Sequence, residues 1–197
     1  MTRPLRIEFP GAMYHVMNRG VERRVIFSDT ADHQTFVDLI HKLSGPSDVE
    51  IHAYCLMPNH DHLVLKAPGG DIRRFMREVN GRYAQFYNRK YRRVGPLFQG
   101  RYRALLVAAD QRLLAVVRYV HHNPVVAGLE ETAAAWRWSS RSAYQAGTEH
   151  AWVKTGLVLG IIDDDRPIAI RTFDRFSEEG GAEDPARDAV ARAILGS

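Results

Sequence analysis

Alternating apolar and polar residues predict five short strands along the chain. The segments are rich in β-branched and aromatic side chains, and they span residues 12–20, 24–27, 49–57, 60–66 and 101–107. In the third segment every second residue from Val49 to Met57 is apolar, as a half-buried strand requires. Pro58 and Asn59 then interrupt the pattern, which predicts that the third and fourth segments form a hairpin.

Helical spacing of apolar residues predicts three longer helices. They lie within residues 29–45, from 71 to about 93, and over 110–123, with a short further helix near 186–195. Gly45 ends the first helix, Asp110 caps the third and Pro124 closes it. The second helix has an apolar stripe from Ile72 to Tyr87, and arginines occupy most of its remaining surface.

The resulting order of elements, ββαββαβα, predicts an α+β fold with a mostly antiparallel sheet packed with helices. The ordered patterns end near residue 147, and the chain beyond Asp163 is charged and rich in glycine. We therefore expect one domain over residues 1–147 and a C-terminal extension of unknown role over residues 148–197.

The composition is ordinary for a globular protein, with 45% hydrophobic and 25% charged residues. The single cysteine, Cys55, excludes an intramolecular disulfide and a multi-cysteine metal cluster. No apolar run approaches the roughly 18 residues of a membrane-spanning helix, and the N-terminus lacks the apolar core of a secretory signal. These features predict a cytoplasmic protein without a membrane partner.

The charge is unevenly distributed along the chain. Residues 71–103 contain ten basic and two acidic residues, a local net charge of +8, whereas residues 161–197 contain nine acidic residues and five arginines, a net charge of −4. This segregation favours a surface that binds a polyanion, followed by an acidic tail. A solvated, arginine-rich helix face is the alternative.

His60 and His62 lie two residues apart at the start of a predicted strand. Their side chains therefore point to the same face, close enough to share one metal ion. Histidine binds several divalent metals, and hard ions such as Mg²⁺ or Mn²⁺ would need oxygen ligands beside it. Two histidines alone do not define a site, so chance polarity on a solvated strand face remains an alternative.

Tyr119 and Asn123 lie four residues apart on a predicted helix, so they share one helix face. A tyrosine hydroxyl, with a pKa near 10, needs activation to act as a nucleophile, and a metal-polarised phosphate would supply it. The amide oxygen of Asn123 could complete a metal site. Alternatively, Tyr119 packs in the core and Asn123 ends the helix.

Five stretches together resemble the single-tyrosine HUH transposases, and most closely the REP-associated tyrosine transposases. They are PGAMYHVMNRG (10–20), YCLMPNHDHLVL (54–65), NRKYRRVGPLFQGRYRA (88–104), VVRYVHHNPVVAG (116–128) and WRWSSRSAYQAG (136–147). They follow the family's order and cover most of residues 3–147. The second and fourth, at this separation, form a specific pair, whereas neither alone would be specific.

The resemblance implies a role for each matching residue. His60 and His62 would bind a divalent metal, Mg²⁺ or Mn²⁺, Asn123 would be the third polar ligand and Tyr119 the nucleophile. It also implies a ferredoxin-like or RRM-like sheet with the histidines on a central strand. Members nick single-stranded DNA beside a hairpin, leaving a 5′-phosphotyrosine and a free 3′-OH that can rejoin strands. The expected partner is hairpin DNA such as REP-like palindromes, bound by a monomer or homodimer.

One position departs from the family, which usually has an apolar residue where this chain has Asp61. On a regular strand Asp61 points toward the core, where a charge is costly without a partner. Alternatively, a backbone amide or an arginine binds it at the hairpin mouth, or a distorted strand brings it into the metal site. His122, three residues from Tyr119, could act as a base or as an alternative ligand.

Phosphate clamps and stacking surfaces for DNA are expected on the basic segment and the first hairpin. The candidates are Arg19, Arg73, Arg77, Arg89, Lys90, Arg92, Arg93, Arg101, Tyr102 and Arg103, with Phe98 as a further stacking residue. The alternative to a strand-transfer enzyme is a non-catalytic, domesticated protein that binds DNA hairpins. That alternative leaves the histidine pair and Tyr119 without a role.

Overall fold

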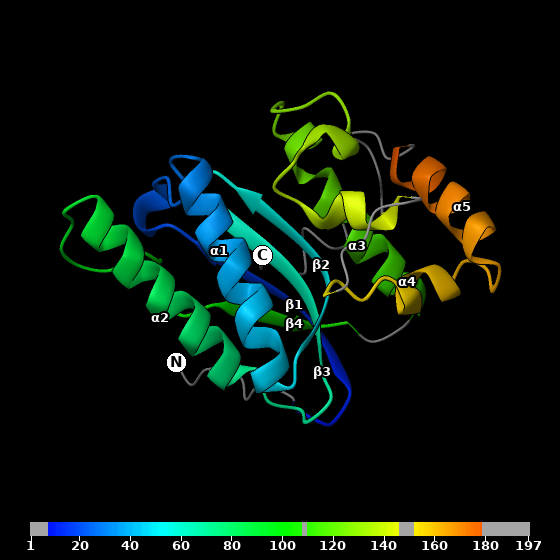
Figure 1. The fold of residues 1–197 in the computed structure, drawn as a ribbon, viewed down its shortest axis with the longest axis horizontal. Helices are drawn as coiled ribbons and strands as arrows, with labels where there is room; N and C mark the ends of the chain where they lie inside the picture. Colours follow the sequence, from blue (N-terminus) through cyan, green and yellow to red (C-terminus); the bar gives the residue numbers. More distant parts are fainter. Residues whose placement is uncertain (1–7, 108–109, 146–151, 179–197) are drawn as a thin grey trace.

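A four-stranded antiparallel sheet forms the centre of the protein in the computed structural model, which describes residues 8–107, 110–145 and 152–178. The strands are β1 (Ala12–Arg19), β2 (Glu50–Met57), β3 (His60–Ala67) and β4 (Arg103–Leu106), in the spatial order β2-β3-β1-β4. Each neighbouring pair is antiparallel, and β1 and β3 are the two interior strands (Figure 1).

Helices α1 (Thr30–Ser44) and α2 (Arg73–Lys90) cover one face of this sheet. Each helix connects two parallel strands that have a third strand between them, β1 to β2 and β3 to β4. Such crossovers are nearly always right-handed, so both helices are placed on the same face. This βαββαβ arrangement is the ferredoxin-like topology.

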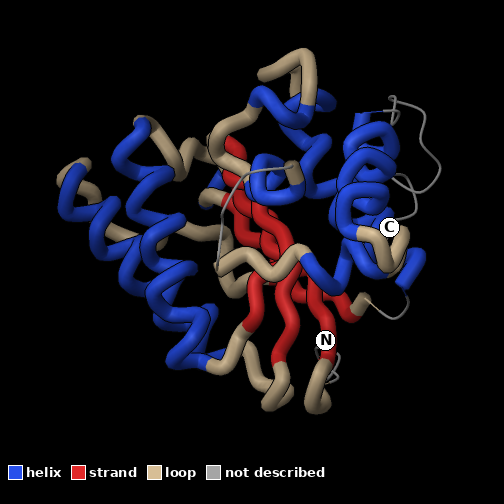
Figure 2. Tube along the Cα trace, turned by 45° about the vertical axis from the view of Figure 1, so that its right-hand side comes forward, coloured by secondary structure: helices blue, strands red, loops and turns tan. Residues whose placement is uncertain are grey.

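Helix α3 (Asp110–Val126) packs against the other face, and α4 (Gly156–Gly160) and α5 (Arg166–Glu178) pack against α3 on that side. Figure 2 shows the strands between the two helical layers. The predicted α+β class, with an antiparallel sheet packed with helices, is confirmed. Of the helices described, none is long and apolar enough to cross a membrane.

Residues 24–27 do not form the second predicted strand. Glu22 and Arg23 adopt left-handed backbone conformations, with φ of 54° and 61°, which turn the chain away from β1. The amides of Ile26 and Phe27 then both donate to the Pro58 carbonyl, at 2.8 and 3.0 Å. Both side chains are buried, so their apolar character reflects a loop that packs into the core.

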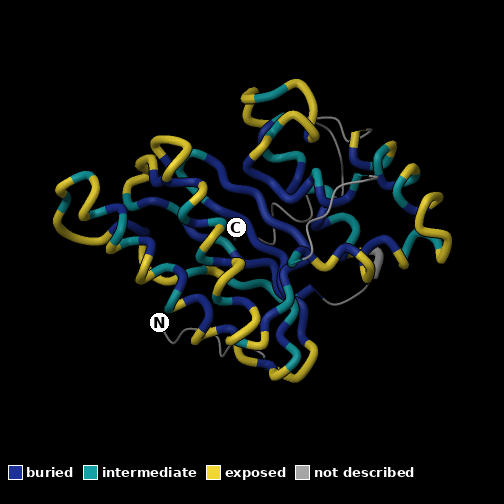
Figure 3. Tube along the Cα trace, viewed as in Figure 1, coloured by how far each residue is buried: buried dark blue, intermediate teal, exposed yellow. Residues whose placement is uncertain are grey.

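Strand β2 is buried on both faces, whereas its alternation predicted a half-buried strand. All its residues except Glu50 are buried, because helices cover the sheet from both sides (Figure 3). Its pairing with β3 shifts register between Ile51 and Ala53, a bulge that a regular alternation does not anticipate.

The segment before residue 146 covers the free edge of β2. The Leu56 amide donates to the Trp138 carbonyl at 2.9 Å, and Trp136 Nε1 donates to the Leu56 carbonyl at 3.1 Å. Ser140 Oγ accepts from the Tyr54 amide at 2.8 Å. The aromatic and serine residues thus satisfy backbone groups that an open sheet edge would expose.

One predicted helix end differs from the structure. Helix α3 continues through Pro124 to Val126, although Pro124 was expected to end it. The carbonyl of Val120, which proline cannot satisfy, lies 3.5 Å from Nδ2 of Asn123.

Three predictions fall outside what the structure describes: capping by the Asp110 side chain, the helix near 186–195 and the boundary at residue 147. Helices α4 and α5 were not predicted, and a buried Arg141 holds α5 through Asp174 at 2.8 Å.

Candidate active site

His60 and His62 lie side by side on β3, on the sheet face that α3 covers. Their ring centroids are 5.0 Å apart, and the rings are nearly perpendicular. His62 is buried, and His60 is partly buried at the end of the strand. Because directly paired residues of antiparallel strands point to the same side, this face also carries Arg19 opposite His60 and Met17 opposite His62.

Helix α3 brings Tyr119 against the histidines. Its apolar residues Val116, Val117 and Val120 are buried, which orients the helix. The Tyr119 ring then meets the edge of the His62 ring, with centroids 5.6 Å apart. The structure thus brings together His60, His62 and Tyr119, which lie far apart in the sequence.

Asn123 follows Tyr119 by one helical turn and is partly buried. Its Nδ2 donates to the Tyr119 carbonyl at 2.7 Å, a local hydrogen bond within the helix. The amide oxygen is therefore the atom of Asn123 that suits a cation.

His15 also belongs to this cluster, and sequence reasoning missed it. Its Nε2 lies 3.0 Å from Nδ1 of His62, and its ring centroid lies 5.9 Å from that of Tyr119. The signal in the sequence was the alternation of β1, which places His15 on the same face as Met17 and Arg19. Only the register of β1 against β3 shows that this face meets His62.

All three imidazoles are held neutral at physiological pH. Burial lowers the pKa of His15 to about 4, and burial together with the nearby Arg19 lowers the pKa of His60 to about 4. Burial lowers the pKa of His62 well below its usual value, with further contributions from His15, His60 and Arg19. A neutral imidazole is the form that donates a lone pair to a metal.

The residues present fit a divalent cation with two histidine ligands. His62 Nε2 is buried and has no hydrogen-bond partner in the described part of the chain, and a cation would satisfy it. Among those residues no three His, Cys, Asp or Glu side chains are grouped to hold a metal. His60, His62 and the Asn123 amide would therefore leave further positions for the oxygen ligands that Mg²⁺ and Mn²⁺ prefer.

Two loops meet at the His60 end of the sheet, and we call residues 19–25 and 89–99 the tip. The Val21 amide donates to the Leu97 carbonyl at 2.9 Å, and the Gln99 amide donates to the Arg19 carbonyl at 2.8 Å. At its exposed end Val94 is 99% accessible. The tip is basic and continuous with the face that carries the histidines.

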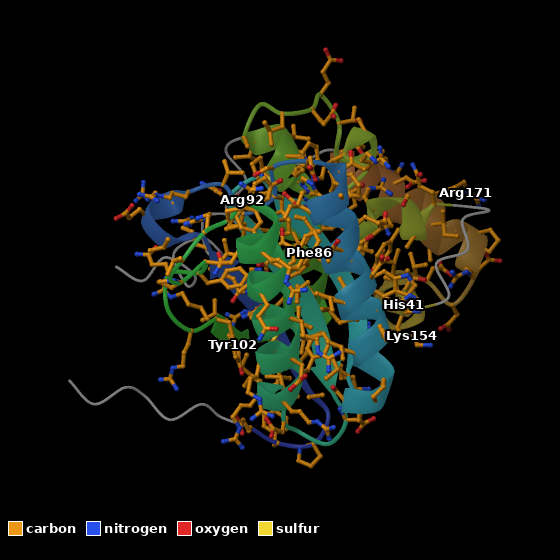
Figure 4. The ribbon with its side chains drawn as sticks, turned by 60° about the vertical axis from the view of Figure 1, so that its left-hand side comes forward. His41, Phe86, Arg92, Tyr102, Lys154 and Arg171 are labelled. Atoms are coloured by element: carbon orange, nitrogen blue, oxygen red, sulfur yellow. The ribbon has the colours of Figure 1, made fainter. Side chains whose placement is uncertain are left out.

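The predicted DNA-binding residues fall into separate groups. Arg19, Arg89, Arg92 and Arg93 belong to the tip, and Arg101, Tyr102 and Arg103 lie at or before β4. Arg103 pairs with Met17 and therefore points to the histidine face. In the view of Figure 4, Arg92 and Tyr102 lie on one side of α2, whereas His41, Lys154 and Arg171 lie on the other.

Four of the candidates are placed differently. Arg73 and Arg77 lie in the first turns of α2, roughly 20 Å along the helix from Arg89 at about 1.5 Å per residue. They are therefore at the end of α2 far from the tip. Lys90 Nζ binds Asp29 and Asp32, each at 2.7 Å, and links α2 to α1. Phe98 is buried, so it is not a stacking surface for a base.

Other tyrosines and histidines near these elements have structural partners. The hydroxyl of Tyr83 donates to the Ile26 carbonyl, and that of Tyr87 to the Val25 carbonyl at 3.1 Å. Both lie on the α1 and α2 side of the sheet. His121 is buried, and its Nε2 lies 2.8 Å from Ser140 Oγ.

Asp61 is buried on the face opposite the histidines, as a regular strand predicts. Its partner is the side chain of Asn18, whose Nδ2 lies 3.1 and 3.0 Å from the two carboxylate oxygens. Asn80 of α2 donates to Asn18 Oδ1 at 2.8 Å, which extends the network to the helix. Burial raises the pKa of Asp61 to about 7, while the hydrogen bonds from Asn18 lower it.

The sequence model of the family described as "Transposase IS200 like" matches residues 9–123. The chain is also similar to a putative REP-associated tyrosine transposase from Haemophilus influenzae, with 29% identity over 131 residues. That alignment covers 60% of this chain and 66% of the relative, slightly less than two thirds of its length.

A solved structure described as a REP-associated tyrosine transposase bound to a REP hairpin has the same fold. The TM-score is 0.64 at 20% identity, and the alignment covers 73% of this chain and 84% of that one.

Replacing Asp61 by asparagine tests whether burial raises the pKa of the Asp61 carboxyl. Because its pKa is about 7 in the folded protein and near 3.8 when unfolded, folding stability falls as the pH rises between these values. The variant lacks this dependence. We expect its free energy of unfolding, relative to the natural protein, to rise by about 1–3 kcal/mol from about pH 5 to about pH 8.

The measurement is chemical denaturation at both pH values, with Asp164→Asn as the control because Asp164 is exposed. The control should differ from the natural protein by less than about 0.5 kcal/mol at either pH. A difference for Asp61→Asn that does not change with pH contradicts the raised pKa.

Proposed function

The chain belongs to the family of IS200-like transposases, and we propose that it is a metal-dependent enzyme that nicks single-stranded DNA beside a hairpin and rejoins the ends. The observation that carries this proposal is the position of Tyr119 against His62, with His60 beside it on the same face. The descriptions of the relative and of the structural neighbour support hairpin DNA, such as a REP-like palindrome, as the substrate.

His60 and His62 would hold a divalent cation, Mg²⁺ or Mn²⁺, and Asn123 would contribute its amide oxygen. Both imidazoles are already neutral at pH 7, so binding does not require them to lose a proton. The chemistry that a bound cation would supply is polarisation of the scissile phosphate, with the negative charge that develops there offset. The protein contributes the orientation of that phosphate toward Tyr119.

Tyr119 Oη forms a bond to the phosphorus while the bond from phosphorus to the 3′ oxygen breaks. The phosphate stays attached to the 5′ strand as a phosphotyrosine, and the departing 3′ oxygen gains the proton that Tyr119 loses. One phosphodiester is exchanged for another, so no external energy source is needed. A 3′-OH can then attack the phosphotyrosine in the reverse sense and join strands.

The tip and the end of β4 bind the DNA next to the histidines. Arg19 and Arg103 point to the histidine face, and the tip adds Arg89, Arg92 and Arg93. Guanidinium groups of this kind clamp phosphates without reading sequence. Tyr102, partly buried beside β4, offers a ring on which an unpaired base can stack.

Tyr119→Phe tests the chemistry. With Mn²⁺ and a labelled library of hairpin oligonucleotides with single-stranded flanks, the natural protein should form a labelled band that survives a denaturing gel. The variant should lose it at least about a thousandfold, because it lacks the nucleophile. Tyr87→Phe is the control, since that hydroxyl lies on the opposite side of the sheet, and it should keep the adduct.

An adduct that persists in Tyr119→Phe contradicts the assignment of the nucleophile. Hairpin binding without an adduct in any of the three proteins contradicts strand transfer and favours the non-catalytic hairpin-binding protein.

Two triple variants, each lacking three arginines, test the DNA-binding surface. Arg89, Arg92 and Arg93 are replaced by alanine in the first, and Arg73, Arg74 and Arg77 in the second. Removing one arginine that binds a phosphate should reduce the slope of log affinity against log salt by about 0.7 for single-stranded DNA. We expect a reduction of about 2 for the first variant, because all three of its replaced arginines lie at the tip. The reduction should be smaller for the second variant, whose arginines lie far from the tip. Equal slopes in the two variants contradict the special role of the tip.

A further inference from the structure

We propose that Asn59 and His15 are positioning residues, each holding the Nδ1–H of one histidine so that both Nε2 atoms are ready to bind a cation. Asn59 acts on His60, and His15 acts on His62. The inference rests on the proposed function, since it concerns how the same site is prepared. It adds two residues to that site, one from the turn before β3 and one from β1.

The contact between Asn59 and His60 fixes the tautomer of His60. Asn59 Nδ2 donates to the Arg23 carbonyl at 3.1 Å, so the other amide atom, Oδ1, faces His60 Nδ1 at 2.7 Å. A carbonyl oxygen accepts but cannot donate, so the proton of the neutral imidazole lies on Nδ1. The lone pair is therefore on Nε2.

The contact between His15 and His62 allows two arrangements. In one, His15 Nε2–H donates to His62 Nδ1, and the proton of His62 lies on Nε2, which then cannot bind a metal. In the other, His62 Nδ1–H donates to His15 Nε2, and the lone pair of His62 lies on Nε2. In both, His15 Nδ1 and His62 Nε2 are buried without a partner among the described residues. Only the second lets a cation satisfy His62.

Such partners are typical of metal sites, where a ligand histidine donates its second ring N–H to a fixed acceptor. The sequence supplies two different acceptors because the two histidines have different surroundings. His60 lies at the mouth of the hairpin, within reach of the turn, whereas His62 lies inside the sheet beside β1.

Asn59 also connects the site with the tip. Its bond to the Arg23 carbonyl holds a residue whose φ of 61° is unfavourable for an arginine, and Gly20 donates to the Asn59 carbonyl at 2.9 Å. DNA bound at the tip would therefore act on the residue that orients His60. Asn59 thus links the tip to His60, which an asparagine in an isolated surface turn would not do.

The affinity for Mn²⁺ tests the proposal with matched substitutions. His15→Leu and Asn59→Ala should each weaken binding by about 10–100-fold, the usual effect of losing such a partner. His15→Gln and Asn59→Asp each keep an acceptor oxygen, and they should restore most of the affinity. The controls are His52→Leu and Asn80→Ala, which remove hydrogen bonds from a buried histidine and an asparagine elsewhere in the fold. They should leave the affinity unchanged.

The second readout is the tautomer of each histidine in the metal-free protein, from the ¹⁵N shifts of the ring nitrogens. We expect the Nδ1–H form for His60 and His62 in the natural protein. His60 should become a mixture of tautomers in Asn59→Ala but not in Asn59→Asp. This readout does not require bound metal, and the natural protein gives it even where a variant fails to fold.

The outcomes distinguish a failure of the proposed function from a failure of the positioning proposal. If the natural protein binds no Mn²⁺, the proposed function fails, and the tautomers alone decide the positioning. If it binds Mn²⁺ and the Leu and Ala variants bind equally well, the positioning proposal fails while the metal site stands. An Nε2–H tautomer for either histidine in the natural protein also overturns the proposal.

Discussion

The antiparallel pairing of β1 with β3 decides which side chains share the face under α3. In the observed register His60 lies opposite Arg19 and His62 opposite Met17, while Asn18 meets Asp61 on the other face. A slip by one residue would turn the histidines toward α2 and place Asp61 beside Tyr119. The hydrophobic core opposes such a slip, because Leu63 and Leu65 would leave the face packed against α1 and α2 and the histidines would take their place. Packing of the core thus also holds the geometry of the site.

Holding polar groups inside the sheet opposes stability. His15 and His62 are buried as neutral rings, the neutral His60 ring is partly buried, and the carboxyl of Asp61 is buried on the other face. The asparagine network around Asp61 offsets part of its burial, whereas His62 Nε2 has no partner in the described residues. Buried polar atoms without partners are rare in proteins and concentrate where function requires them. His62 Nε2 is one of several such atoms in the described residues, and its ring lies beside the rings of His60 and Tyr119.

The sequence predicted features that depend on neighbouring residues in the chain, such as strands and helices. It missed contacts that depend on how strands and loops pair in the fold. Alternation and helical spacing placed β2, β3 and α2 within a few residues, and family motifs indicated His60, His62 and Tyr119. Residues 24–27 had the composition of a strand, but two left-handed residues and the Pro58 carbonyl make them a loop. His15 was missed because its contact depends on the register between β1 and β3. The contact between Asn59 and His60 was missed because the orientation of the Asn59 amide depends on the path of a neighbouring loop.

The most direct test of the central claim is pulsed electron paramagnetic resonance of Mn²⁺ bound to the protein, which detects nitrogen nuclei coordinated to the ion. The account predicts couplings from two imidazole nitrogens in the natural protein. One should disappear in His60→Ala and one in His62→Ala, while Tyr119→Phe keeps both. Bound Mn²⁺ without nitrogen couplings, or couplings that persist in the double alanine variant, would show that the histidine pair on β3 is not the metal site.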